Sequence, residues 1–74
     1  MNSPHSPYIV DIEKHTVTHK PTGIVMRFEP HNAGGWSGQA DEATIPADIT
    51  AKFLAGLARR MGDAWDDEQR RAKR

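Results

Sequence analysis

Residues 13–30, EKHTVTHKPTGIVMRFEP, decide the fold because they place the clearest turn signal of the chain between two alternating segments. Pro21 suits the second position of a type I turn, and Gly23 can adopt the left-handed conformation that closes a three-residue hairpin loop. A two-residue type I′ loop is excluded because the proline ring prevents a positive φ. The stretch therefore predicts a β-hairpin, with Pro30 at the end or the edge of its second strand.

The turn also predicts a register for the two strands. We expect Ile24, Met26 and Phe28 to form one apolar face, flanked by threonine methyl groups. The pairs on this face are Lys20 with Ile24, Thr18 with Met26, and Thr16 with Phe28. The pairs on the opposite face are His15 with Glu29, Val17 with Arg27, and His19 with Val25.

The segment before the hairpin also alternates like a strand. Tyr8, Val10 and Ile12 lie on one face at a period of two. Val17 falls on the other parity, so a bulge, a bend or a strand break is expected near residues 13–15. Residues 1–7 (MNSPHSP) contain two prolines that oppose a helix, and they are predicted to form a flexible arm.

The second half of the chain is a loop followed by a helix. Residues 31–44 (HNAGGWSGQADEAT) are rich in glycine and polar residues, which predicts a loop. The helix is expected from Ile45 and Pro46 to about Arg71, with Asp48 as its cap or as an acid favoured by the helix dipole. Its apolar face continues in phase through Gly62, which favours one continuous helix. That face carries Ile49, Phe53, Leu54, Leu57, Met61, Ala64 and Trp65. The helix surface offers ion pairs at i,i+4, namely Asp66 with Arg70 and Asp67 with Arg71.

These elements predict an α+β fold, in which a small antiparallel β-hairpin or three-stranded meander precedes one long amphipathic C-terminal helix. The expected organisation is an arm over residues 1–7, a single domain over 8–71 that includes the glycine-rich loop 31–44, and a basic end over 72–74. A helix of about 25 residues is roughly 38 Å long, whereas a six-residue strand spans about 20 Å. One hairpin therefore leaves part of the helix face uncovered, and small cores are marginal. A third strand, a second copy of the chain or another protein would supply the cover, and a homodimer is favoured.

No pattern in the sequence indicates an enzyme. His15 and His19 would share a strand face but lie about 13 Å apart, too far for one metal ion, so neither a metal site nor a cofactor is expected. No nucleophile elbow, phosphate loop or zinc-protease pattern is present. The chain has no cysteine, no signal-peptide pattern and no apolar run long enough to span a membrane. A cytoplasmic protein without a membrane partner is therefore expected.

The charge of the chain is balanced overall but uneven along its length. Ten basic residues offset ten acidic ones, and four of the basic residues fall within the last five positions. A neutral total argues against a dedicated nucleic-acid binder. The basic helix end still supports a nucleic-acid-associated regulator as the alternative function. Its contacts would come from Arg59, Arg60, Arg70, Arg71, Lys73 and Arg74.

The remaining prediction is a small non-catalytic binding or regulatory protein that acts through protein–protein contacts, as a homodimer. Trp36 would either fold back over the core or anchor a partner, because a tryptophan on a loop is a common binding anchor. Trp65 would lie in the core or in a dimer seam. The predicted partner-binding residues are Trp36, Met61 and Trp65.

Overall fold

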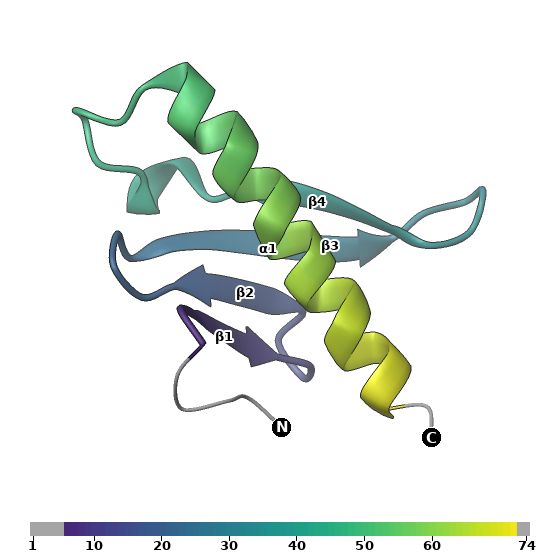
Figure 1. The fold of residues 1–74 in the computed structure, drawn as a ribbon. Helices are drawn as coiled ribbons and strands as arrows, with labels where there is room; N and C mark the ends of the chain where they lie inside the picture. The colour runs from purple at the N-terminus through teal and green to yellow at the C-terminus, as the bar shows by residue number, and fades with distance from the viewer. Residues whose placement is uncertain (1–5, 73–74) are drawn as a thin grey trace.

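The computed structural model describes residues 6–72 and confirms the α+β fold. A four-stranded antiparallel sheet in the order β1-β2-β3-β4 is followed by one long helix, α1 (Ala51–Ala72), which crosses one face of the sheet diagonally (Figure 1). The third strand that would close the core is therefore present, and a fourth strand is added to it. The positions predicted for the arm at residues 1–5 and for the last two residues of the basic end lie outside the described residues.

The first two strands explain the change in apolar phase. β1 (Tyr8–Asp11) pairs with β2 (Thr16–His19), so that Val10 lies opposite Val17 on the helix side of the sheet. Between them the chain reverses over residues 12–15, where the Lys14 N–H donates to the Asp11 carboxylate (3.1 Å) and His15 has a φ of 56°. Because a two-strand reversal restarts the alternation, a strand break is the alternative that occurs here, out of the three that were expected.

The predicted register of the central hairpin is wrong by one residue. β3 (Ile24–Pro30) pairs with β2 so that His19 faces Ile24 and Val17 faces Met26. The loop has four residues rather than three, and the Gly23 N–H donates to the His19 carbonyl oxygen (2.7 Å). The cause is burial, since this register moves Val17 onto the apolar face, where it is fully buried, instead of placing it beside Arg27.

The expected loop at residues 31–44 contains a strand and a short 3₁₀ helix. β4 (Trp36–Ala40) pairs with β3 in a regular register from Pro30 with Trp36 to Met26 with Ala40. The short helix η1 (Glu42–Thr44) follows, and its N-terminus is capped by the Asp41 carboxylate, which accepts from the Ala43 N–H (3.1 Å). The glycine-rich composition concealed a strand because β4 consists mostly of small and polar residues.

The helix begins later than the sequence suggests. Thr50 is its cap, because its hydroxyl oxygen accepts from the Phe53 N–H (3.1 Å). Pro46 and Asp48 lie before the helix, in a turn closed by a hydrogen bond from the Ile49 N–H to the Pro46 carbonyl oxygen (3.2 Å). The helix is continuous through Gly62, as the phase of its apolar face predicted.

One core lies between the helix and the sheet. Leu57, Met61 and Trp65 are fully buried against the sheet, at the heart of the predicted apolar face. The sheet contributes Val17, Ile24, Met26 and Phe28 to the same cluster. The sheet thus covers this part of the helix face within one chain, as the alternative with a third strand expected.

Candidate functional site

The three residues predicted to bind a partner are brought together, but in the core. Met61 and Trp65 have no exposed surface, and Trp36 is half-buried as the first residue of β4. The Trp65 ring stacks on Phe28 with ring centres 5.0 Å apart, and Trp36 meets it edge-on at 5.2 Å. Such pairs stabilise a core beyond the area they bury. Trp36 therefore folds back over the core, and neither Met61 nor Trp65 lies at the surface of the chain.

His15 completes this aromatic cluster. Its ring lies edge-on to Trp36 (5.1 Å) and to Trp65 (5.8 Å). Its carbonyl oxygen accepts from the Phe28 N–H (2.8 Å), so the predicted pairing with Glu29 is replaced by one with Phe28. The left-handed backbone of His15 at the end of the β1–β2 turn places the side chain on the helix side of the sheet.

His19 has a separate environment at the other end of β2. Its ring lies 5.6 Å from that of Tyr8, and its Nδ1 is 2.8 Å from the Thr22 hydroxyl oxygen. Partial burial and then the positive charge of Arg60 lower the pKa of His19 below its ordinary value. Within residues 6–72, no group of three or more histidine and carboxylate side chains is arranged to hold a metal ion.

The arginines predicted to contact nucleic acid are interleaved with carboxylates. Arg70 lies 3.8 Å from Asp67, and Arg71 lies 3.2 Å from Glu68. Both pairs are spaced i,i+3 rather than at the predicted i,i+4. Arg59 and Arg60 are exposed about three turns earlier in the helix. Lys73 and Arg74 lie outside the described residues. The described part of the helix end therefore carries both signs of charge, and such a surface favours phosphate binding only weakly.

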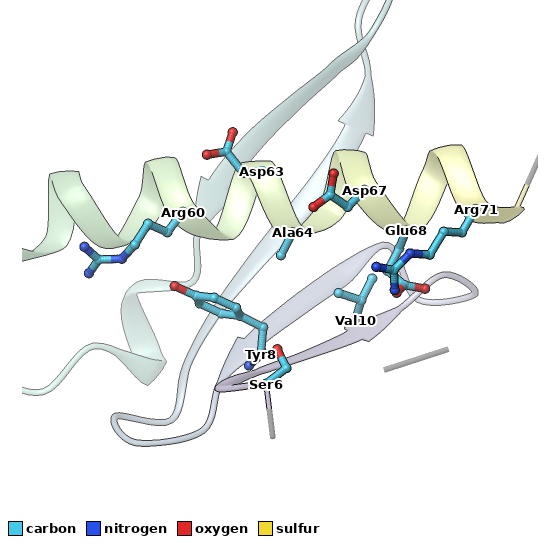
Figure 2. Close-up of a pocket in the computed structure, with 9 residues that line it drawn as sticks. All are labelled: Ser6, Tyr8, Val10, Arg60, Asp63, Ala64, Asp67, Glu68 and Arg71. Atoms are coloured by element: carbon cyan, nitrogen blue, oxygen red, sulfur yellow. Dashed lines mark hydrogen bonds and ion pairs between the residues drawn. The ribbon is translucent and has the colours of Figure 1, made fainter. Parts of the chain in front are cut away.

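A groove separates β1 from the C-terminal half of α1. It has a volume of about 350 Å³. Figure 2 shows the Tyr8 ring and the Val10 side chain on the sheet side, with charged side chains extending from the helix above them. Those side chains are Arg60, Asp63, Asp67, Glu68 and Arg71. Since both signs of charge line the groove, it has no strong preference for an anion or a cation.

The opposite edge of the sheet differs in kind. β4 is an edge strand. The hydrogen bond from the Asp41 N–H to the Val25 carbonyl oxygen (2.8 Å) determines which residues of β4 bond to β3. In an antiparallel ladder the residues alternate, so Ser37 and Gln39 direct their backbone groups to β3. Trp36, Gly38 and Ala40 direct theirs away from the sheet. We call these outward N–H and C=O groups, together with the exposed side chains of Ser37 and Gln39, the β4 edge.

Gly38 keeps the centre of the β4 edge open. A Cβ atom at this position would lie 2.6 Å from the Phe28 ring and 2.9 Å from the Met26 methyl group. Because real Cβ atoms are not found so close to other atoms, packing against Phe28 requires glycine here. The outward backbone of residue 38 is consequently not shielded by a side chain of its own.

The open face of the sheet continues the β4 edge with polar groups. A hollow of about 380 Å³ is bordered by Arg27 and Glu29 of β3, Ser37 and Gln39 of β4, and the start of η1. Arg27 reaches Asp41 at 3.3 Å and remains largely exposed. This face can offer side-chain hydrogen bonds to a chain that pairs with β4.

No helix of the described residues is long and apolar enough to cross a membrane.

Comparison with protein families, curated proteins and solved structures finds no match for this chain, so geometry alone identifies the β4 edge as the candidate site. The sequence signal for it was weak. Residues 36–40 (WSGQA) alternate between core-facing and polar positions. One of the three core-facing positions is a glycine, which has no side chain to mark the alternation.

Proposed function

We propose that the protein is a non-catalytic binding protein that acts through protein–protein contact, by adding an extended strand of a partner to the β4 edge. Strand addition is a recurring mode of recognition, in which backbone hydrogen bonds provide affinity and side chains on alternate positions provide specificity. The single observation that supports it is the outward backbone of Trp36, Gly38 and Ala40 on an uncharged edge strand.

The composition of β4 makes this edge unusual. Sheet proteins commonly protect an edge with a charged side chain, a proline, a bulge or a cover. Within Trp36–Ala40 there is no charged residue and no proline, and the pairing with β3 contains no bulge. An unprotected edge in a small protein favours pairing with another chain, either as a specific contact or as aggregation.

Photo-crosslinking tests the proposal directly. A photoreactive amino acid is placed at Gln39, which is exposed on the open face, and in a control protein at Lys14, which is exposed in the β1–β2 turn. After irradiation in cells, we expect protein adducts at position 39 that mass spectrometry identifies and that the Ala40→Pro change removes. If positions 39 and 14 give the same adducts, or if position 39 gives none, strand addition at the β4 edge is wrong.

A further inference from the structure

We propose that the strand added at the β4 edge is β4 of a second copy of this chain, related by a two-fold axis that passes through Gly38. This inference rests on the proposed function and names its partner. It states more than a dimer, because it specifies the orientation, the register and the residues that face one another.

The backbone pattern of β4 is complementary to itself in this register. If two β4 strands run antiparallel with Gly38 opposite Gly38, then Trp36 lies opposite Ala40 of the second copy, and Ala40 lies opposite its Trp36. All of these residues direct their backbone groups outward. Directly opposed residues of this type exchange both N–H and C=O hydrogen bonds. No outward group between positions 36 and 40 is then left without a partner, and the two sheets become one continuous sheet.

The side chains also fit the two-fold register. On the helix side, the large Trp36 faces the small Ala40 of the second copy, so neither position is crowded. On the open face, Ser37 faces Gln39 of the second copy at the closer, non-hydrogen-bonded spacing, where side chains interact most strongly. Because β4 has no charged side chain, no like charges oppose one another in a pairing of identical strands.

The helix supplies further contact area. In the view of Figure 1, the first turns of α1 extend beyond β4 on the helix side of the sheet. They include Phe53, which is 41% exposed and is one of the few large apolar side chains at the surface. In the two-fold arrangement this end of the helix lies close to the second copy, so it can add contact area beyond the paired strands.

Self-pairing is favoured over a foreign strand by this complementarity. A two-fold contact uses the same patch on both chains, so every residue must suit its own symmetry partner. The centre of β4 meets this condition with a glycine, and each flanking pair combines residues of different size. A foreign strand requires no such symmetry, and nothing in β4 selects its side chains by charge.

Molar mass measured by light scattering, from micromolar to millimolar protein, is the first test. We expect the wild-type chain to approach twice the monomer mass as concentration rises, and the Ala40→Pro variant to remain a monomer. Proline is tolerated where an edge N–H faces outward, so this variant should fold, and circular dichroism checks that it does. A wild-type chain that stays monomeric throughout overturns the inference. If crosslinks at position 39 then lead to a different protein, the proposed function still stands.

Paired charge variants test the register itself. One variant carries Ser37→Lys and Gln39→Lys, and the other carries Ser37→Glu and Gln39→Glu. In the two-fold register, like charges face each other within each variant, so we expect each to dimerise at least roughly tenfold more weakly than the wild type. Mixing the two variants should restore a dimer, because every facing pair then has opposite charges. Both positions are exposed, and they lie opposite Glu29 and Arg27 of β3. Each variant therefore gains one like-charge and one opposite-charge pair within the chain, so the net effect on the fold should be small, and circular dichroism checks it.

The same variants separate this register from other dimers. Two variants that dimerise as strongly as the wild type would show that the copies meet elsewhere, and would overturn the inference. Two monomeric variants that stay monomeric when mixed would also overturn it, since the facing pairs would then differ from those proposed. A double change with Ser37→Lys and Gln39→Glu in one chain is the matched control, and it should dimerise at least as well as the wild type.

Discussion

The two edges of this sheet are built differently although they belong to the same four strands. β1 contains Asp11, follows Pro7, and borders a groove lined by charged side chains of α1. β4 contains neither a charged residue nor a proline, and it pairs with a neighbouring strand, β3, on one side only. Charge and proline are standard means of preventing strands from pairing between molecules. The comparison indicates that intermolecular pairing is opposed at β1 and permitted at β4.

The largest loss of stability is expected from a substitution in the core that supports both edges. Trp65→Ala removes a fully buried ring that stacks on Phe28, and such changes cost about 3–5 kcal/mol of unfolding free energy. Because the core is shared, we expect both edges to lose hydrogen-exchange protection together. Chemical denaturation and hydrogen exchange measure this. Loss of protection in β4 alone would show that the two edges fold independently.

A change at Gly38 should separate the edges. Gly38→Ala places a methyl group against Phe28 and Met26, which we expect to destabilise the fold by about 1–3 kcal/mol. Hydrogen exchange should increase first in β4 and only slightly in β1. The matched control is Gly62→Ala in the helix, where the added Cβ meets no atom within 4 Å and should stabilise the protein by roughly 0.5–1 kcal/mol. Equal effects of the two substitutions would contradict the close packing of β3 on β4.

Removing the charge from β1 should make the two edges more alike. Asp11→Asn keeps a side-chain oxygen that can accept from the Lys14 N–H, so the turn should persist. We expect the unfolding free energy to change by less than about 1 kcal/mol, because a neutral acceptor is weaker than a carboxylate. Association measured by light scattering should increase, and it should persist when Ala40→Pro is added. No added association would show that Asp11 does not protect β1.

The smallest effect is expected from pH at His19. Its pKa is lowered in the folded state, so the unfolded chain takes up a proton more readily as the pH falls. The wild type should therefore lose stability relative to His19→Gln as the pH drops below about 6.5. The effect should be small because the ring is only partly buried. Denaturation curves at several pH values test this, and a difference that is constant with pH would contradict it.

Elements with a strong period could be predicted from the sequence, and those shaped by tertiary contact could not. Alternation in residues 8–12 and 24–28 identified β1 and β3, and the turn signal at residues 20–23 identified β2 as the partner of β3. The apolar period of the helix identified its buried face. β4 was missed because its central residue is glycine for a packing reason, the contact with Phe28, which no local pattern reveals. The hairpin register was wrong because a loop containing Pro21 and Gly23 suits either of two lengths.

The sequence could not separate core from interface at the predicted partner-binding residues, for a related reason. Tryptophan is enriched both in cores and at interfaces, and composition alone does not distinguish the two. Once β4 is recognised as a strand, Trp36 points to the helix side by alternation and becomes part of the core. The backbone groups that form the β4 edge carry no residue-type signal, so they become visible only when the strand order is known.

The order of the elements has a consequence for synthesis. All four strands pair with their neighbours in sequence, so the sheet can form as soon as Ala40 has left the ribosome. The residues that cover its apolar side, from Leu57 to Trp65, are translated after all four strands. At about 5–20 residues per second, the nascent sheet remains uncovered for on the order of seconds. During that interval both faces of β4 are accessible, and neighbouring nascent chains on one messenger RNA are the first copies that it can meet.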